Sequence, residues 1–156
     1  MATVSQLPSL LRSKLVLATC PVPDLNGDCW IWMGAATNGG YGKITISIGN
    51  PPWPERKTLL THRFSYQYLI GEIPNGLTLD HLCRNRACCN PGHLEPVTCK
   101  VNTLRSPVAI TAINSLKTKC LNGHDFDREN VYHPPNRPER RYCKTCQKLR
   151  TENRKR

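Results

Sequence analysis

The sequence predicts a small α+β protein that bound metal stabilises in place of a large apolar core. Only 38% of its 156 residues are hydrophobic, and it contains 13 prolines and 10 glycines. Its nine cysteines lie mainly in two clusters with histidine, one within residues 79–102 and the other within residues 119–146. Domains with so thin a core usually depend on metal ions or disulfides for stability.

The expected compartment favours metal over disulfides. The N-terminal residues lack the layout of a secretory leader, because Arg12 and Lys14 interrupt the only apolar run. No segment approaches the length of a membrane span, so no membrane partner is expected. We therefore expect a cytoplasmic protein with reduced thiols, in which clustered cysteines bind zinc. The odd number of cysteines also argues against a complete disulfide framework.

The charge indicates a polyanionic partner. The formal net charge is +11, and residues 139–156 alone carry eight lysines or arginines against two glutamates. Nucleic acid is the commonest partner of so basic a chain. A basic surface that serves only solubility is the alternative, but it would not require this local concentration at one end.

The first half of the chain predicts a helix and a hairpin. Leucines at roughly helical spacing within residues 1–19 indicate a short amphipathic helix. Residues 29–33 and 41–48 alternate in polarity around the turn Asn38-Gly39-Gly40, which predicts an N-terminal β-hairpin. We expect Trp30 and Trp32 to be core residues, with stacking on bases as the alternative. Residues 49–57 should form a loop, and residues 58–74 a strand that passes into a helix.

The central stretch predicts the order strand, loop, helix. Residues 77–81 alternate as a strand, so that His81 and Asp80 point to opposite faces or Asp80 sits at a bend. Residues 83–93 contain turn formers and few apolar groups. Pro96 suits the first position of a helix that would run to about Leu104. Residues 106–118 predict a helical linker, with Ser106 as its cap.

The first zinc site is predicted by the pattern C-x4-C-x4-H, which has metal-ligand spacing. Its members are Cys83, Cys88 and His93. Cys29 is the preferred fourth ligand and Cys20 the second choice. Cys89 and Cys99 are further alternatives, although Cys89 follows Cys88 directly and should point elsewhere.

The second zinc site is predicted by two short knuckles at either end of a proline-rich spacer. The expected ligands are Cys120, His124, Cys143 and Cys146, with His133 as a competitor for His124. The chain thus divides into a domain at 1–105 with its motif at 79–102, the linker at 106–118, and a zinc-binding module with a basic tail at 119–156.

The residues that remain in the central stretch suit phosphodiester hydrolysis. His81 can act as a general base near neutral pH if an acceptor, such as a loop carbonyl, fixes its other ring nitrogen. Asp80 and Asn102 offer oxygen ligands of the kind that Mg²⁺ prefers. The alternative is that His81 is a buried structural histidine and Asn102 a surface residue of a helix. The zinc pattern between them favours the functional interpretation.

The stretch LDHLCRNRACCNPGHLEPVTCKVN resembles the HNH, or His-Me finger, endonucleases. The core H-L-C-x4-C-x-N-P-x-H-L, with Asn102 twenty-one residues after His81, is most similar to phage-type HNH proteins and to the zinc-bearing His-Cys box homing endonucleases. The hairpin before the motif and the C-terminal C-x3-H…C-x2-C module are similar to those of the phage-type proteins. The resemblance covers roughly residues 29–146.

The resemblance implies a ββα-metal fold and a role for each residue of the site. It implies that His81 is the general base, that Asn102 binds a catalytic Mg²⁺ or Mn²⁺, and that Asp80 assists as a second ligand. Asn90 takes the place of the middle asparagine, with a supporting role in the loop. Cys83, Cys88 and His93 would bind structural zinc with an upstream cysteine. A family arginine that stabilises the leaving group has its candidates in Arg56, Lys57 and Arg63.

These observations predict a metal-dependent endonuclease that nicks or cuts double-stranded DNA, with two structural zinc ions. The expected DNA-binding residues are Arg56, Lys57, Arg63, Lys148, Arg150, Arg154, Lys155 and Arg156. Cutting both strands requires a homodimer or two successive nicks, and phage packaging or a mobile element would supply other partners. The alternatives are a zinc-stabilised DNA-binding regulator without catalysis, which needs none of Asp80, His81 and Asn102, and a protein that acts on RNA.

Overall fold

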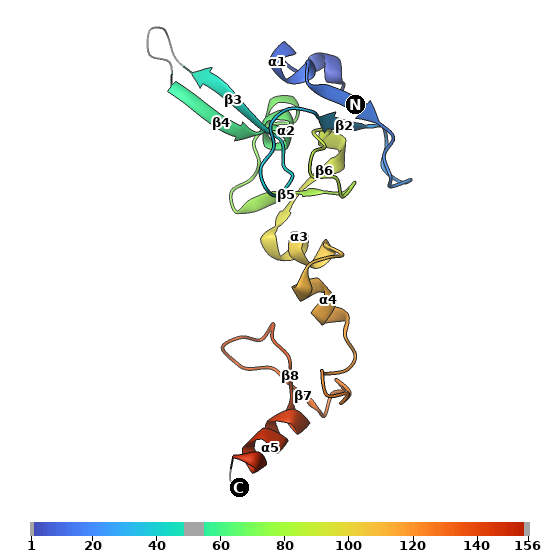
Figure 1. Cartoon of the computed structure of the whole chain (residues 1–156), viewed down its shortest axis with the longest axis vertical. Helices are drawn as coiled ribbons and strands as arrows, with labels where there is room; N and C mark the ends of the chain where they lie inside the picture. Colours follow the sequence, from blue (N-terminus) through green and yellow to red (C-terminus); the bar gives the residue numbers. More distant parts are fainter. Residues whose placement is uncertain (1, 49–54, 155–156) are drawn as a thin grey trace. The chain divides into compact units, whose positions relative to one another are not determined.

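A computed structural model describes residues 2–48 and 55–154. The chain forms two compact units, residues 1–102 and residues 103–156 (Figure 1). Short two-stranded sheets, short helices and two cysteine–histidine clusters confirm the predicted α+β class. The nine cysteines all lie in the described residues, and none of them forms a disulfide. No helix within the described ranges is long and apolar enough to cross a membrane.

The N-terminal segment is less helical than its leucine spacing predicts. A 3₁₀ turn at Val4–Gln6 (η1) and the short helix α1 at Ser9–Arg12 are followed by strand β1 at Leu15–Ala18. Leu7 and Leu11 are fully buried, and Leu15 packs against the same core from the strand. The prediction of one helix is therefore correct only for its middle, because the later leucines serve a sheet.

The two strands of the predicted N-terminal hairpin are present, but each pairs with another strand. Strand β2 at Cys29–Trp32 pairs with β1, with Leu17 opposite Trp30, and does not pair with the returning strand. Strand β3 at Lys43–Ile48 pairs instead with β4 at Glu55–Leu60. A bridge between Ala36 and Gly42 is all that remains of the expected pairing among the described residues. Arg56 and Lys57, expected at a loop exit, lie in strand β4.

The core of the first unit is small and lies where these sheets meet helix α2 at Thr61–Leu69. Trp30 and Trp32 are each 5% exposed, so the prediction that they are core residues is confirmed. Helix α2 attaches to the central loop through the buried Ser65, whose hydroxyl donates to the Cys89 carbonyl at 2.6 Å. The buried members of this core are Leu7, Leu11, Trp30, Trp32, Ile44 and Cys89.

The central stretch has the order strand, loop, strand, helix. Strand β5 at Leu77–His81 agrees with its prediction and pairs with strand β6 at Leu94–Thr98. The 3₁₀ turn η2 at Pro91–His93 precedes β6, and helix α3 begins at Cys99 and ends at Arg105. The prediction of a helix from Pro96 is wrong. Proline is tolerated at an edge strand as well as at a helix start, and here Pro96 lies opposite Leu79 in the two-stranded sheet.

The second unit contains little regular structure. Its helix α4 at Ile110–Leu116 has Ala109 as its cap, so the predicted start at Ser106 is wrong. Strands β7 at Val131–Tyr132 and β8 at Tyr142–Cys143 pair with each other, and helix α5 follows at Lys144–Asn153. Its buried apolar side chains among the described residues are Ala112 and Cys143.

Candidate metal centre and hydrolytic site

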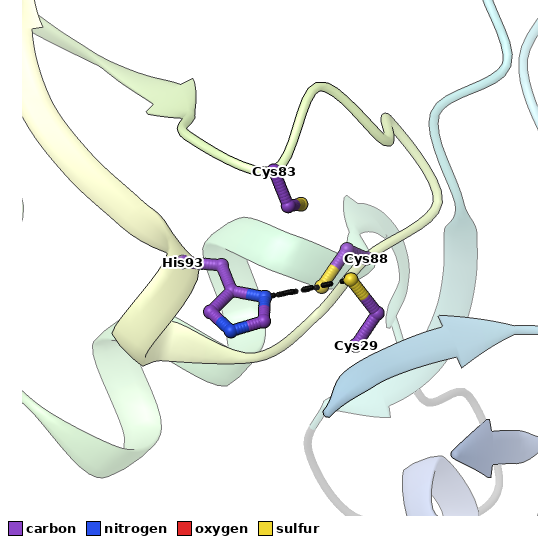
Figure 2. A group of neighbouring side chains, drawn as sticks. All are labelled: Cys29, Cys83, Cys88 and His93. Atoms are coloured by element: carbon purple, nitrogen blue, oxygen red, sulfur yellow. Dashed lines mark hydrogen bonds between the residues drawn. The ribbon is translucent and has the colours of Figure 1, made fainter. Parts of the chain in front are cut away.

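The first cluster brings four buried side chains from three elements to one point. Cys29 comes from β2, Cys83 and Cys88 from the loop after β5, and His93 from η2 (Figure 2). Their ligand atoms all lie within 4.8 Å of one another. His93 Nδ1 is 3.5 Å from Cys29 Sγ and 3.7 Å from Cys88 Sγ. Tetrahedral zinc with ordinary bond lengths separates sulfur from nitrogen ligands by about 3.6 Å, so the donor set fits zinc.

Backbone pairing explains why Cys29 completes this cluster. The loop lies alongside β2, with the Cys89 amide donating to the Trp30 carbonyl at 2.8 Å and the Trp32 amide donating to the Ala87 carbonyl at 2.9 Å. This pairing carries Cys88 to the strand that begins with Cys29. Of the alternatives, Cys20 packs beside the cluster, Cys89 belongs to the apolar core, and Cys99 is exposed.

Further hydrogen bonds hold the histidine ligand in place. His93 Nε2 lies 3.3 Å from the Asn26 carbonyl, and a donor at Nε2 leaves the lone pair of Nδ1 for the metal. Asn90 donates from its side chain to the Asp28 carbonyl at 2.7 Å and accepts from the Gly92 amide at 2.9 Å. Asn90 therefore joins the segment before Cys29 to the turn that carries His93. Its predicted support of a hydrolytic centre stays a prediction.

The thiols of this cluster differ in their readiness to ionise. A hydrogen bond from the Cys88 thiol is the main cause that lowers the pKa of Cys83 to about 5. Burial is the main cause that raises the pKa of Cys29 to about 12. Ionisation is thus favoured at Cys83, and metal binding must displace protons from the other thiols. Affinity for the metal should therefore rise with pH.

The second cluster has the same chemistry in the second unit. The ligand atoms of Cys120, His124, Cys143 and Cys146 lie within 4.8 Å of one another. Cys120 Sγ is 3.7 Å from Cys146 Sγ, and His124 Nδ1 is 3.3 Å from Cys146 Sγ. These spacings also suit tetrahedral zinc. The competitor His133 has another partner, because its Nδ1 donates to the Pro138 carbonyl at 2.8 Å.

Two asparagines that the sequence analysis did not single out support the second cluster. Asn130 donates to Cys143 Sγ at 3.4 Å, and Asn122 donates to Cys146 Sγ at 3.3 Å. A tight turn places the first knuckle, since the Gly123 amide donates to the Cys120 carbonyl and Gly123 has a φ of 81°. Glycine adopts this conformation without cost. Amide donors to sulfur favour the thiolate, which is the form that binds metal.

His81 ends strand β5 and is 6% exposed. Its Nε2 lies 3.2 Å from the Cys88 carbonyl, an acceptor in the loop that also supplies two cluster thiols. When Nε2 donates this bond, Nδ1 carries the lone pair and can accept a proton. Burial is the main cause that lowers the pKa of His81, so its imidazole is neutral at physiological pH. The arrangement suits a base whose orientation depends on the loop that carries Cys83 and Cys88.

The aromatic rings of His62 and Tyr41 lie close to the ring of His81. The rings of His62 and His81 meet edge to face with centroids 4.8 Å apart, and Tyr41 lies 5.8 Å from His81. His62 is 5% exposed, and its Nδ1 has no hydrogen-bond partner within the described part of the chain. No spacing in the sequence connects position 62 with position 81, because only the fold brings them together.

Asp80 and Asn102 lie on the elements that the prediction required. Asp80 precedes His81 on β5 and faces Glu95 across the sheet, whereas His81 faces Leu94, so the two side chains leave opposite faces. Asp80 is buried and binds Arg84, with its Oδ1 2.8 Å from the guanidinium. Asn102 lies half-buried on α3. Joint binding of one divalent ion by these residues stays a prediction.

The basic residues predicted to bind DNA come from both units. Arg56 and Lys57 are exposed on β4, and Arg63 is half-buried on α2. Lys148 and Arg150 are exposed on α5, and Arg154 follows at its end. Lys155 and Arg156 lie outside the described residues. Each unit thus contributes its own cations.

Residues 59–104 match the model of the HNH endonuclease family. The matched segment runs from the end of β4 through α3 and contains Asp80, His81, Asn102 and three members of the first cluster. The resemblance predicted from the sequence is thereby confirmed over this segment.

Among curated proteins, the chain is similar to three phage proteins. It is 37% identical over 75 residues to protein 2.8 of Escherichia phage T7, covering 48% of this chain and 46% of that protein. It is 41% identical over 54 residues to the uncharacterized gene 5.3 protein of Enterobacteria phage T3, covering 35% and 54%. It is 33% identical over 76 residues to protein 7.7 of phage T7, covering 49% and 52%. The chain spans about half the length of these relatives, and no solved structure matches it.

Proposed function

We propose that this chain is a metal-dependent endonuclease that hydrolyses phosphodiester bonds of double-stranded DNA. The observation that carries the proposal is the position of His81. Its ring is oriented by the Cys88 carbonyl, at 3.2 Å, within the segment that matches the HNH endonuclease model. A buried imidazole fixed through one nitrogen is suited to removing a proton from water at the other.

The proposed chemistry assigns one task to each part of the central stretch. His81 accepts a proton from the attacking water. Asp80 and Asn102 would hold a divalent ion through oxygen ligands, and such an ion neutralises phosphate charge and stabilises the leaving oxygen. The cations Arg56 and Lys57 on β4 and Arg63 on α2 are the candidates for contact with the leaving group. Asn90 supports the loop from within.

The first cluster would bind a structural zinc ion and not a catalytic one. Four protein ligands complete a tetrahedral zinc shell and leave no position for water or substrate. The zinc would instead order a loop that has few apolar side chains, and with it the Cys88 carbonyl that orients His81. The same reasoning makes the second cluster a structural site.

The charge and the relatives support the proposed substrate and setting. A net charge of +11 favours a polyanionic partner, and the cations of α5 would add salt-sensitive affinity. Similarity to phage proteins supports action in the cytoplasm of an infected host cell. A homodimer would allow cleavage of both strands, and packaging or mobile-element partners are compatible with the same setting.

Replacement of His81 tests the proposal. We expect His81→Ala to lower the rate of plasmid nicking with Mg²⁺ or Mn²⁺ by roughly 10²- to 10⁴-fold, the usual contribution of a general base. Zinc content and DNA affinity should stay close to those of the wild type. His133→Ala is the matched control, because His133 is exposed and lies outside both clusters.

Two outcomes would contradict the proposal. Normal nicking by His81→Ala would remove His81 from the mechanism. Tight DNA binding by the wild type, without nicking at any concentration of Mg²⁺ or Mn²⁺, would favour the non-catalytic regulator.

A further inference from the structure

Arg84 contacts both Asp80 and His81, the two strand residues of the proposed hydrolytic site. Its guanidinium Nη1 donates to Asp80 Oδ1 at 2.8 Å, and its backbone amide donates to the His81 carbonyl at 2.9 Å. It directly follows Cys83, a member of the first cluster. The proposed chemistry gives this arginine no task. One side chain thus connects the loop of the first cluster with the carboxylate that would hold the divalent ion.

The backbone of Arg84 has an unusual conformation. Its φ is 59°, and it is the one non-glycine residue with a positive φ in the described part of the chain. The left-handed region is unfavourable for a residue with a Cβ, and such strain persists where the surrounding structure enforces it. Here Cys83 belongs to the first cluster, and the Asn85 carbonyl accepts from the Cys88 amide at 3.1 Å. The loop therefore holds position 84 in a conformation that keeps the guanidinium beside Asp80.

The two partners of this ion pair differ in their access to solvent. The side chain of Asp80 is 3% exposed, whereas that of Arg84 is 40% exposed. A buried carboxylate requires cations or hydrogen-bond donors around it, because water cannot hydrate its charge. The arginine is free of this constraint, since its exposed guanidinium can turn into solvent. A second cation can then take its place at Asp80.

The charges around Asp80 favour a divalent ion over a single positive charge. Glu95 lies directly opposite Asp80 in the paired strands, so two carboxylates belong to one face of the sheet. Like charges at such positions repel each other. Arg84 brings one positive charge to this face, whereas Mg²⁺ or Mn²⁺ would bring two and binds carboxylate oxygen well. The guanidinium and the divalent ion therefore compete for Asp80.

The displaced guanidinium has a suitable partner in the proposed substrate. Arginine binds phosphate through two parallel hydrogen bonds. A divalent ion on Asp80 would hold phosphate oxygens within about 4 Å of the carboxylate, because distances from Mg²⁺ to oxygen are about 2.1 Å. The side chain that contacts Asp80 in the absence of the ion needs only a short movement to contact that phosphate.

We propose that Arg84 competes with the divalent ion for Asp80, and that it exchanges the carboxylate for a DNA phosphate when the ion binds. Arg84 is then a positioning residue that couples the binding of the ion to the binding of DNA. Without DNA, the arginine lowers affinity for the ion. With DNA, the ion and the arginine each have a partner. This inference rests on the proposed function for Asp80 as a ligand and for DNA as the substrate.

The first test measures the Mn²⁺ affinity of the full-length, zinc-loaded protein without DNA, from the electron paramagnetic resonance signal of unbound Mn²⁺. We expect Arg84→Ala to raise this affinity about tenfold, because it removes one charge-assisted hydrogen bond that competes with the ion. Arg84→Gly should have the same effect, and glycine adopts a φ of 59° without strain. Asp80→Asn should lose the site. Zinc content and circular dichroism establish that each variant is folded.

Arg86→Ala is the matched control for this measurement. It removes the same charge from the same loop, but Arg86 donates to the Gly39 carbonyl at 2.9 Å and lies over the ring of Tyr41. Any general effect of charge on Mn²⁺ affinity should therefore be equal in the two alanine variants. The excess in Arg84→Ala reports the competition for Asp80.

The second test measures DNA affinity against salt concentration, with and without Mn²⁺. All proteins in this test also carry His81→Ala, so that the DNA stays intact. With Mn²⁺, Arg84→Ala should make the slope of log affinity against log salt shallower by about 0.9, the contribution of one phosphate contact. Without Mn²⁺ the slope should not change, because Arg84 then remains on Asp80.

Three results would overturn the inference. The first is that neither Arg84→Ala nor Arg84→Gly binds Mn²⁺ more tightly than Arg86→Ala does. The second is that Asp80→Asn binds Mn²⁺ as tightly as the wild type. The third is a difference in salt slope between Arg84→Ala and its parent that is the same with and without Mn²⁺.

Plasmid nicking by the wild type, measured in parallel, separates this inference from the proposed function. An Mn²⁺ affinity that depends on Arg84, in a protein that does not nick, contradicts only catalysis. Nicking by a protein whose Mn²⁺ affinity does not depend on Arg84 contradicts only the exchange.

Discussion

At the scale of single residues, the most unusual feature is a pair of neutral histidines in contact. The rings of His62 and His81 lie 4.8 Å apart, and both are buried. Burial is the main cause that lowers the pKa of His62 to about 3, with His81 and Arg63 as further causes. A charge on either ring would oppose a charge on the other. Burial, the main cause of the lowered pKa of His81, keeps the proposed base in its proton-accepting form.

The lowered pKa of His62 predicts a pH-dependent stability. The folded protein binds this proton far less readily than the unfolded chain, whose histidine has the ordinary value of 6.5. The stability contribution is therefore complete above pH 6.5 and is lost as the pH falls toward 3, at about 1.4 kcal/mol per pH unit. We expect His62→Gln to make the free energy of unfolding less dependent on pH between about 4.5 and 6.5.

The exposed His133 offers the matched control for this measurement. His133→Gln should retain the slope of the wild type, and release of zinc at acid pH affects all three proteins alike. Urea unfolding at a series of pH values gives the slopes. Equal slopes for the wild type and His62→Gln would show that His62 titrates at its ordinary pKa.

At the scale of elements, the approach of the 35–43 turn to α2 depends on a glycine. A side chain at position 42 would place its Cβ 2.6 Å from Trp32 Cδ1 and still closer to Thr61 Oγ1. The Gly42 carbonyl also accepts from the Thr61 amide at 2.9 Å, at the start of α2. The turn, the helix and the tryptophan therefore cannot separate without loss of packing and of this hydrogen bond.

Gly42→Ala should destabilise the first unit by about 1–3 kcal/mol, the usual cost of overpacking a core. Because a unit of this size loses roughly 4–8 °C per kcal/mol, the melting temperature should fall by several degrees or more. Gly39→Ala is the control, since its Cβ would meet Tyr41 at 3.4 Å, an ordinary contact. The same melting temperature for both variants would mean that the packing at Gly42 relaxes freely.

The elements also show which parts of the fold the sequence could predict. Strand β5 and the two ligand sets were predictable, because alternation and metal-ligand spacing are local properties of the chain. The partner of β2 was not predictable. The pairing of four-residue strands is decided by tertiary packing, and the pairing of Trp30 with Leu17 leaves no local signal in the sequence. Pro96 was assigned to a helix start, because proline is tolerated equally at a helix start and in an edge strand. The contact between His62 and His81 was not predictable either, because a contact across nineteen residues has no sequence pattern.

At the scale of the whole molecule, each of the two units carries its own cysteine–histidine cluster. The ligands of one cluster all lie within residues 1–102, and those of the other within residues 103–156. The histidine proposed as the base belongs to the first unit, and the exposed cations of α5 belong to the second. Metal in one unit should therefore fold only that unit and support only its task.

Paired cysteine variants test this independence. The wild type should bind two zinc ions per chain, and Cys83→Ser and Cys143→Ser should each retain one. Cys83→Ser should lose nicking activity, because the loop that orients His81 loses its metal. Cys143→Ser should keep nicking at low salt, yet bind DNA more weakly. Cys143 belongs to the second cluster and directly precedes α5, so loss of the metal should release the helix that carries Lys148 and Arg150.

Three measurements distinguish the outcomes. Elemental analysis gives the zinc content, limited proteolysis shows which unit has unfolded, and the salt dependence of binding counts the phosphate contacts that are lost. The slope of log affinity against log salt should become shallower in Cys143→Ser by nearly one for each cation that no longer contacts phosphate. If Cys143→Ser instead loses both zinc ions, or stops nicking at low salt while residues 1–102 remain folded, the two units depend on each other and the division of tasks is wrong.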